Sequence, residues 1–383
     1  MRVGIDLTAL LPAATGVDVS LLGLVRHLAA IDRDTAYSLL VNREDRDHFV
    51  LLPANFAIVP LSLRPRPARL AFQQVLLPAA AALLRLDVVH SPSFILPLVR
   101  GRARHLLTVH DLTFDTLPHV HIPLRRSRAF RAAVAHSIRR ADLVTVPSRS
   151  VASVIRARLP DVDAGKLRVV PWGIADEFRP QSPGAIADVR ARLGLPERYL
   201  LFVGTIEPRK NLPVLLEAYR RVAAHRTAPP HLVLAGRPGW GVDEVLALAR
   251  TPALRPLVHI AGYVPQADLP ALYTGALLLA YPSLEEGFGF PPLEAMACGV
   301  PVLASTGSAL SENLGGAAEL VSCDDVDGFA DAIERLIADA DLRRARRQQG
   351  FARAAAFRWT ETAAQMRSSY SELAAHGDRR DVT

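Results

Sequence analysis

The sequence contains few lysines, cysteines and aromatic residues, and the last two shortages each exclude a class of protein. Of the 45 lysines and arginines, only Lys166 and Lys210 are lysines. Cys298 and Cys323 are the only cysteines, which rules out a disulfide framework and points to a reducing compartment. Aromatic residues make up 6% of the chain, and no nucleic-acid recognition module is evident, so nucleic acid is disfavoured as a partner.

Long apolar runs are also missing. The most lipid-like stretch, residues 76–86, is interrupted by Pro78 and Arg85 and is too short to cross a bilayer. Met1 and Arg2 lead directly into a short strand-like segment, which is not the pattern of a secretory signal. We therefore expect a cytoplasmic protein, and its 383 residues are enough for two domains.

The net charge of +7 comes from arginines that cluster in the first half of the chain. These arginines predict a basic face on the first half of the protein. It is either simply solvated or a surface that meets anionic lipid on the inner side of the cell membrane. The clusters are Arg64, Arg66 and Arg69, then Arg100, Arg102 and Arg104, and then Arg125, Arg126, Arg128 and Arg131.

Short β-rich runs alternate with helical patterns along both halves of the chain, which predicts an α/β fold of two doubly wound, Rossmann-like domains. In the first half, strands are predicted at 2–6, 37–41, 88–90, 106–110, 143–146 and 167–170, and helices at 19–31, 70–85, 124–140 and 150–158. In the second half, strands are predicted at 199–203, 231–234, 258–261, 277–280, 302–304 and 320–321, and helices at 212–224, 265–274 and 325–340.

A stretch rich in proline and glycine, residues 171–196, separates the two halves. We expect a first domain at 1–175, a second domain at 176–358, and a helix and tail at 359–383. Doubly wound sheets place their ligand crevices at the carboxyl ends of the strands, so the two domains should face each other across a cleft.

The most informative motif is Glu-Glu-Gly-Phe-Gly-Phe-Pro-Pro-Leu-Glu at 285–294, between an apolar strand and a predicted helix. Its glycines allow positive φ and close approach to a ligand. The helix start favours an anion such as a diphosphate, and Glu286 and Glu294 can accept hydrogen bonds from sugar and ribose hydroxyls. The alternative is that both glutamates only cap the helix or complement its dipole.

A second motif, 203–212, follows the first strand of the second half and contains Gly204, Arg209 and Lys210 before a helix start. A glycine turn, two cations and a helix N-terminus predict a diphosphate cradle. Lys210 is notable because a chain that uses arginine almost everywhere has retained lysine here, which suggests that the site needs a compact ammonium. The alternative is a surface helix start with two unrelated charges.

With Glu286 and Glu294 separated by seven residues, the chain resembles the family-4 retaining glycosyltransferases of the GT-B fold, which are group 1 glycosyltransferases. The resemblance covers nearly the whole chain. It implies that the domain at 1–175 binds the acceptor, that the domain at 176–358 binds the nucleotide sugar, and that the helix of 359–383 returns to the first domain. It implies that Arg209 and Lys210 bind the donor phosphates. It also implies that His110, followed by Asp111, contacts the transferred sugar near the reacting carbon.

The resemblance further implies donor contacts from the loop 287–290, which contains Gly287, Phe288, Gly289 and Phe290, and from the glycine turn at Gly16. The nucleotide base would lie against Tyr263 and Val264, although either residue could equally be core packing. The family often has a second glycine two residues after the first; this chain has Asp18 instead, so a plain turn at Gly16 is an equal alternative.

The implied activity is retaining hexosyl transfer from a nucleotide-diphosphate sugar to a hydroxyl of a glycan or lipid-linked acceptor in cell-surface polysaccharide assembly. The runs 204–212 and 110–117 are most similar to mannosyltransferases that use GDP-mannose. In these motifs no Asp-x-Asp metal site, His/Cys ligand cluster or cofactor-binding lysine is evident, so we expect chemistry without a metal or cofactor. A UDP-hexose-dependent transferase is the alternative, and a GT-B epimerase and a nucleotide-sugar sensor are two further classes.

Overall fold

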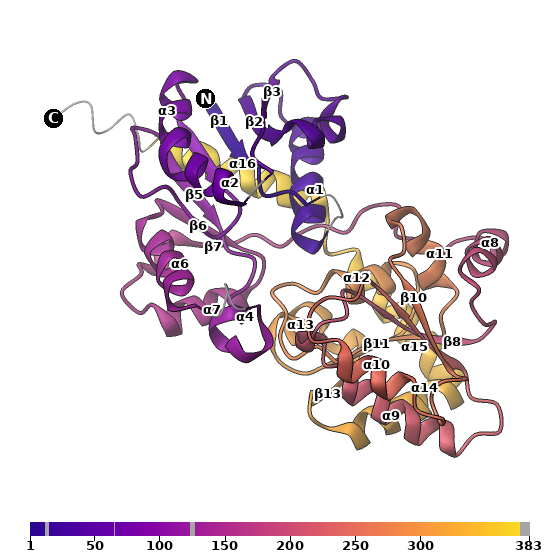
Figure 1. Ribbon diagram of the computed structural model, residues 1–383. Helices are drawn as coiled ribbons and strands as arrows, with labels where there is room; N and C mark the ends of the chain where they lie inside the picture. Colours follow the sequence, from indigo (N-terminus) through magenta and orange to yellow (C-terminus); the bar gives the residue numbers. More distant parts are fainter. Residues whose placement is uncertain (12–14, 65, 123–126, 376–383) are drawn as a thin grey trace. The chain divides into compact units, whose positions relative to one another are not determined.

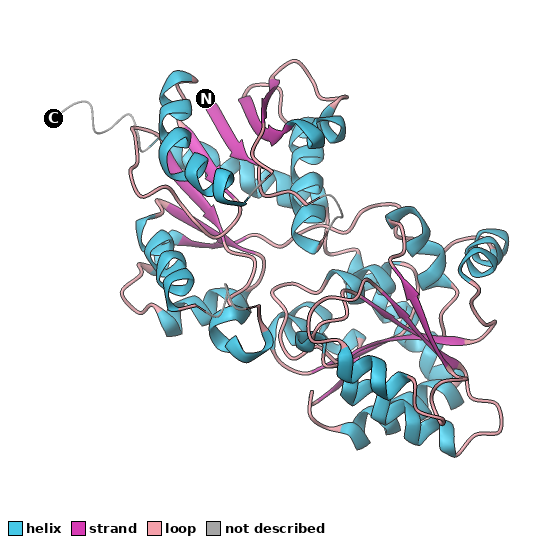
Figure 2. Cartoon of the chain, in the orientation of Figure 1, coloured by secondary structure: helices cyan, strands magenta, loops and turns pink. Residues whose placement is uncertain are grey.

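The computed structural model describes residues 1–11, 15–64, 66–122 and 127–375. They form two compact units: the first comprises Met1–Asp115, Leu124–Gly173 and Arg358–Thr383, and the second Thr116–Pro123 and Ile174–Phe357. Each unit has one sheet with helices on both faces (Figure 2). The prediction of an α/β protein with two doubly wound sheets is confirmed.

The sheet of the first unit has seven parallel strands in the order β3-β2-β1-β4-β5-β6-β7. Its inner strands, such as β4 and β6, are buried along their whole length, as expected where helices cover both faces of a parallel sheet. The strands are β1 Arg2–Asp6, β2 Ala36–Asn42, β3 Phe56–Leu61, β4 Val88–Ser91, β5 Arg104–Thr108, β6 Leu143–Val146 and β7 Leu167–Val169.

The helices of the first unit include one that returns from the far end of the sequence, as predicted. This helix, α16 (Trp359–Ala375, yellow in Figure 1), packs against α1 (Gly16–Ile31). At Gly23 of α1, a Cβ would lie 2.3 Å from the Trp359 ring, so only glycine fits there. The other helices are η1 Arg43–Phe49, α2 Arg66–Ala71, the π-helical η2 Phe72–Leu76, α3 Leu77–Leu83, α4 Thr113–Thr116, which runs into the second unit, α6 Arg128–Arg140, α7 Arg149–Arg158 and η4 Ala164–Lys166.

The sheet of the second unit has six parallel strands in the order β10-β9-β8-β11-β12-β13. The strands are β8 Tyr199–Val203, β9 His231–Ala235, β10 Val258–Gly262, β11 Leu278–Tyr281, β12 Val302–Ser305 and β13 Glu319–Val321. The helices are η3 Pro118–Val120, α8 Pro183–Leu193, η5 Pro208–Lys210, α9 Leu212–Ala224, α10 Asp243–Ala249, η6 Gln266–Asp268, α11 Leu269–Thr274, α12 Phe290–Ala297, α13 Ser308–Leu314, η7 Gly315–Ala317, α14 Val326–Ala338 and α15 Ala340–Ala354.

Several elements differ from the sequence prediction. Strand β3 and helices α8, α10, α13 and α15 were not predicted. Helix α8 lies within the proline-rich boundary stretch, yet its start and end signals are present in the sequence: Ser182 caps the N-terminus, Pro183 is the first helical residue, and Gly194 ends the helix at φ +62°. The start of the helix predicted at 124–140 and the arginines Arg125 and Arg126 lie outside the described residues.

Several of the clustered arginines have acidic partners. Arg64 lies 2.8 Å from Asp45, and Arg100 and Arg104 both pair with Asp142 at 3.2 and 3.0 Å. These pairs reduce the net positive charge that the sequence alone suggests for this face. Among the described helices, none combines the length and the apolar character needed to cross a membrane.

Candidate active site

The predicted phosphate-binding residues lie where the strand order of the second sheet reverses direction. From β8 the chain winds outward to β9 and β10, and it then returns to place β11 on the opposite side of β8. The loops that follow β8 and β11 therefore diverge at the carboxyl ends of two neighbouring strands, which is where doubly wound sheets bind ligands. A hydrogen bond of 2.9 Å from the Leu284 amide to the Arg209 carbonyl joins the two loops.

Glu286 of the loop after β11 accepts hydrogen bonds from both cations of the loop after β8. The Lys210 Nζ lies 2.6 Å from Glu286 Oε1, and the Arg209 Nη1 lies 2.9 Å from Glu286 Oε2. Ser283 Oγ donates to Oε1 at 2.6 Å and the Tyr281 hydroxyl at 3.1 Å. Along the sequence, Lys210 lies 76 positions before Glu286 and Arg209 is its neighbour, and the fold brings the three charged residues into one cluster.

Two further contacts orient the cations. Lys210 Nζ donates to the Tyr281 hydroxyl at 2.7 Å, and the Arg209 guanidinium pairs with Glu207 at 2.9 Å. Asn211 adopts φ +53° and donates to the carbonyls of Pro282 and Cys323, which turns the chain from the loop into α9. This local turn places Arg209 and Lys210 beside the loop of Glu286.

The charges of the cluster stabilise one another in a buried setting. Burial lowers the pKa of the Lys210 ammonium, and the neighbouring Arg209 lowers it further, against the raising effect of Glu286. Burial alone would raise the pKa of the Glu286 carboxyl. The charges of Arg209 and Lys210 outweigh that effect and hold its pKa well below the usual value. Glu286 is therefore ionised at neutral pH, and it compensates the two cations.

The loop 287–290 ends at a left-handed residue that starts α12. Gly289 has φ +93°, and a Cβ there would lie 2.8 Å from the Leu310 side chain, so the position requires glycine. Phe288 is buried against Phe290 and Phe357 at centroid distances of 4.9 and 5.6 Å, so its ring is core packing. Any contact between Phe288 and a donor would therefore come from its backbone, as for its neighbours in the loop.

The N-terminus of α12 offers fewer donors than the motif suggested. The helix begins at Phe290, so Pro291 and Pro292 occupy the next two positions, and proline has no N–H. A diphosphate site at this end would therefore depend on backbone amides that precede the two prolines.

Glu294 is the fifth residue of α12, so it lies just beyond the first turn of the helix. It is buried, and the Tyr273 hydroxyl donates to its Oε2 at 2.9 Å. Burial raises the pKa of Glu294 to about 7, against the lowering effect of the Tyr273 hydrogen bond and with a further increase from the charge of Glu177. Near neutral pH this carboxyl can therefore either donate or accept a hydrogen bond.

The two residues proposed to contact the base differ in exposure. Tyr263 is 51% exposed, and the Arg237 guanidinium lies 5.7 Å from its ring centroid. Val264 is buried, so it packs in the core and the tyrosine ring presents the accessible surface. The nearby Gly236 is required by close packing, because a Cβ there would lie 1.8 Å from the Gly204 carbonyl, and Gly204 itself has φ +148°.

His110 and Gly16 belong to the first unit, and they lie apart from each other along its sheet. His110 lies two residues beyond the end of β5, and its Nε2 is 2.8 Å from the Pro92 carbonyl. Because a carbonyl only accepts, this contact places a proton on Nε2. The ring also stacks on Trp172 at 5.7 Å and 23°. His110 is thus held in a fixed orientation.

Asp18 explains why the turn at Gly16 departs from the family pattern. Its carboxylate accepts hydrogen bonds from the amides of Leu11 and Thr15 at 3.0 and 2.6 Å and from the Thr15 hydroxyl at 2.6 Å. An internal carboxylate therefore occupies the start of α1, where a phosphate would otherwise bind. The plain-turn interpretation of Gly16 accounts for these contacts.

Comparison with known proteins agrees with this architecture. A family model described as "Glycosyl transferases group 1" matches residues 187–353, and one described as "Glycosyltransferase Family 4" matches residues 14–178. O-antigen chain mannosyltransferase B of Escherichia coli is 34% identical over 288 residues, which are 75% of this chain and 74% of that protein. The chain belongs to the group 1, family-4 glycosyltransferases.

Two other similarities support the assignment at different levels. The serotype-specific mannosyltransferase WbdA of Escherichia coli is 31% identical over 228 residues, or 58% of this glycosyltransferase and 28% of WbdA, so the chain spans a small part of that relative. Sucrose-phosphate synthase from Thermosynechococcus elongatus superimposes with a TM-score of 0.79 over 98% of this chain and 99% of its own, at 23% identity. That likeness confirms the GT-B fold, and the family makes the protein a hexosyltransferase.

The sequence did not reveal the residues that support the cluster in this glycosyltransferase. Tyr281 and Ser283 bind Glu286, Tyr273 binds Glu294, and Glu207 binds Arg209. The tyrosines lie in apolar segments that look like ordinary core. A buried tyrosine hydroxyl usually has a polar partner, and this was the available signal. Tyr281 lies at the carboxyl end of a strand, and Tyr273 faces the helix of the motif.

The loops of the cluster are also supported by residues 116–122 of the second unit. The Thr116 hydroxyl donates to Glu285 Oε2 at 2.7 Å, and the backbone carbonyl of Glu285 accepts from Arg209 Nη1 at 2.9 Å. The Trp240 Nε1 donates to the Val120 carbonyl at 3.1 Å. This segment is thus fixed to loops on both sides of β8.

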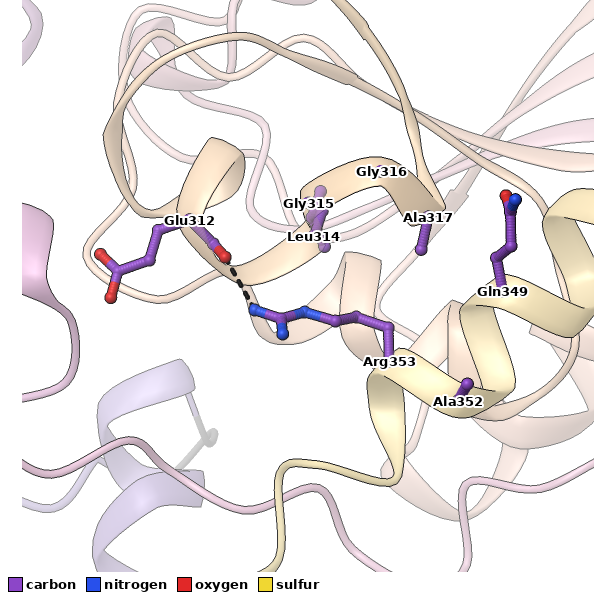
Figure 3. A pocket seen from close by; sticks show the side chains of 8 residues that line it. All are labelled: Glu312, Leu314, Gly315, Gly316, Ala317, Gln349, Ala352 and Arg353. Atoms are coloured by element: carbon purple, nitrogen blue, oxygen red, sulfur yellow. Dashed lines mark hydrogen bonds between the residues drawn. The ribbon is translucent and has the colours of Figure 1, made fainter.

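An open pocket of about 560 Å³ lies elsewhere in the second unit, between α13, η7 and α15 (Figure 3). It is lined by Glu312, Gln349 and Arg353, among others, and the Arg353 guanidinium donates to the backbone carbonyls of Glu312 and Asn313 at 2.7 and 2.6 Å. Arg353 therefore satisfies the C-terminal carbonyls of α13. None of the predicted donor-binding residues lines this pocket.

Proposed function

We propose that this glycosyltransferase moves mannose from GDP-mannose to a hydroxyl of a glycan or lipid-linked acceptor, with retention of the anomeric configuration, in cell-surface polysaccharide assembly. The observation that carries the proposal is the cluster of Arg209, Lys210 and Glu286 at the switch point of the second sheet. The choice of mannose is supported by the Escherichia coli relatives, which are named as mannosyltransferases.

The proposed chemistry uses the cluster to stabilise the leaving group. The bond between the sugar C1 and the β-phosphate oxygen breaks, and a bond forms between C1 and the acceptor oxygen on the same face. A phosphate oxygen of the departing GDP takes the acceptor proton, so no enzyme nucleophile is needed. Arg209 and Lys210, fixed in advance by Glu286, would then meet the charge that develops on the diphosphate.

The remaining residues have supporting roles in this proposal. Glu294 would bind the ribose hydroxyls, and Tyr263 would contact the base, while the backbone of 287–290 would bind the diphosphate. Gly204 keeps the phosphate loop close to the sheet. His110, oriented by Trp172 and the Pro92 carbonyl, would contact the transferred sugar.

We further propose that transfer needs neither a metal ion nor an organic cofactor and that it takes place in the cytoplasm. Within the described ranges, no group of three or more His, Cys, Asp and Glu side chains could hold a metal ion. Arg209 and Lys210 can supply the positive charge that a metal would otherwise bring to the diphosphate. A cytoplasmic location also matches the two unpaired cysteines, Cys298 and Cys323.

The test is a panel of nucleotide sugars with and without a mannose-terminated acceptor. We expect slow hydrolysis of GDP-mannose alone, faster transfer with the acceptor, and an α-linked product from the α-linked donor by NMR. Preferential use of UDP-glucose or UDP-galactose would refute the donor assignment, and an inverted anomer would refute retention. Interconversion of sugars without transfer would identify an epimerase, and binding without turnover a sensor.

A further inference from the structure

The helical run of α2, η2 and α3 presents one apolar face to the core and a second apolar face to solvent. On the inner side, Phe72, Leu77 and Ala81 pack with Leu40 of β2 and Val89 of β4. This packing is the ordinary role of an amphipathic helix on a parallel sheet. The opposite side would be expected to carry charged and polar residues.

The outer side is apolar instead. Val75 is 68% exposed, Leu76 56% and Leu83 84%, and Leu70 is also exposed. The intervening exposed positions 71, 79 and 82 are alanines, and no charged residue occurs from Leu70 to Leu84. Isolated exposed leucines are common, but a whole helix side without charge is a mark of an interaction surface.

The loop between β4 and β5 extends this surface. Gln74 Nε2 donates to the Leu96 carbonyl at 3.2 Å, and the Leu98 amide donates to Gln74 Oε1 at 2.9 Å. A Cβ on Gly101 would lie 3.9 Å from the Pro78 carbonyl, so the loop also touches the helix one turn later. The loop therefore runs along the helix, and it exposes Leu98 and Val99 beside it. We call Leu70, Val75, Leu76, Leu83, Leu98 and Val99 the apolar face.

The edge of the apolar face is basic. Between His48 and His110 the sequence has a single acidic residue, Asp87. Arg85 follows the end of α3 and Arg102 follows Val99; both are exposed, and in the described part of the chain neither forms a salt bridge. Arg100 and Arg104 share the single carboxylate of Asp142, and the loop brings Arg102 toward the end of the apolar face where Arg85 lies, so this end is positively charged.

We propose that the apolar face docks on an anionic lipid bilayer, with Val75, Leu76, Leu83, Leu98 and Val99 entering the headgroup boundary. Arg85 and Arg102 would lie among the lipid phosphates, which complement their charge. A second copy of the chain is a poorer occupant, because pairing this face with itself would bring the same arginines together without acidic partners. The inference does not depend on the identity of the donor. Docking would bring the enzyme to the membrane that holds the proposed lipid-linked acceptor.

The experiment is sedimentation of the full-length protein with vesicles of phosphatidylcholine, with or without phosphatidylglycerol. We expect binding to the vesicles that contain phosphatidylglycerol and loss of that binding at high salt, because screening weakens the arginine–phosphate attraction. Leu76→Gln with Leu83→Gln should lower the partition coefficient at least about tenfold, because each leucine loses its apolar contact with the lipid. The matched control is Leu51→Gln, which changes an exposed leucine outside the helix.

Three outcomes would overturn the proposal: no binding of the unaltered protein to anionic vesicles, equal loss of binding in the Leu51 control, or a dimer that the double substitution converts to monomers. Transfer to a water-soluble acceptor without vesicles is measured in parallel. We expect it to be unchanged in the double variant, since both leucines lie far in sequence from the catalytic cluster and are solvent-exposed. Failure of the lipid inference thus differs from failure of the proposed function, which would appear in that soluble assay.

Discussion

Lys210→Met is the most direct test of the cluster at the switch point. Methionine keeps most of the volume of the buried side chain and removes only the ammonium. The substitution deletes the 2.6 Å contact with Glu286 and the 2.7 Å contact with Tyr281. Glu286 still accepts hydrogen bonds from Arg209, Ser283 and Tyr281, so its carboxylate does not become an unpaired buried charge.

The expected effects on stability and on rate differ in size. A lost hydrogen bond between charged groups costs about 1.5–3 kcal/mol, but burial of the Lys210 ammonium is itself unfavourable, as its lowered pKa shows. We therefore expect the unfolding free energy to fall by no more than about 2 kcal/mol. Loss of one preorganised cation from a leaving diphosphate should cost about 2.7–4 kcal/mol in the transition state, or 10²–10³-fold in kcat.

The assay compares kcat for transfer and the thermal unfolding midpoint in the unaltered protein and three variants. The chain supplies its own control, because Lys166 is the other lysine: it is only partly buried and donates to the Arg139 carbonyl, and Lys166→Met should change neither quantity. A folded Lys210→Met enzyme within about tenfold of normal kcat would refute the phosphate role. Lys210→Arg asks whether charge alone suffices; we expect little recovery, since the larger guanidinium must enter a packed site.

Three further predictions concern the carboxylates and the metal. Because burial raises the pKa of Glu294 to about 7, the folded state keeps a proton that the unfolded state loses above about 4.5. Stability from this group is thus complete at low pH and is lost as pH rises through 7, by about 3 kcal/mol. In urea unfolding, the free energy of unfolding of the Glu294→Gln variant should therefore increase relative to that of the unaltered protein between pH 5 and pH 8. A pH-independent difference would contradict the argument. Glu286→Gln should lower kcat about a hundredfold and cost about 3–5 kcal/mol in unfolding free energy, because Arg209 and Lys210 lose their shared counter-charge; unchanged melting would refute that pairing. Transfer should persist in excess EDTA, and activity that manganese or magnesium restores would reveal a metal requirement.

The sequence predicts the fold and the charged centre of the site because both leave local patterns. Strand and helix periods define two parallel sheets, and glycine, proline and cation spacing marks the loops of Lys210 and Glu286. Contacts that depend on tertiary pairing leave no such pattern. The partnership of Tyr273 with Glu294 joins two helices that look apolar, and nothing in the sequence near Tyr273 distinguishes a hydroxyl that binds a carboxyl from one in an ordinary core.

Two other features were missed for identifiable reasons. Hydrophobic periodicity reports that residues 70–85 form a helix, but a helix with apolar residues on both sides has no polar stripe to show which side is buried. The arginine clusters suggested a basic face, whereas their acidic partners, such as Asp142, lie in other elements of the chain. Charge counted along a sequence overstates the charge that a folded surface presents.

The return of α16 to the first unit affects how this protein is made. Ribosomal synthesis delivers residues in order, so the whole of Ile174–Phe357 emerges before the helix that completes the first unit. Until then, Gly23 lacks the Trp359 ring that packs against it, and His90 on β4 lacks the Tyr370 hydroxyl that lies 2.9 Å from its Nδ1. The usual order of domain completion is reversed: the nascent chain carries a finished second unit while the first, although synthesised earlier, still exposes an apolar surface to chaperones until Trp359–Ala375 arrives.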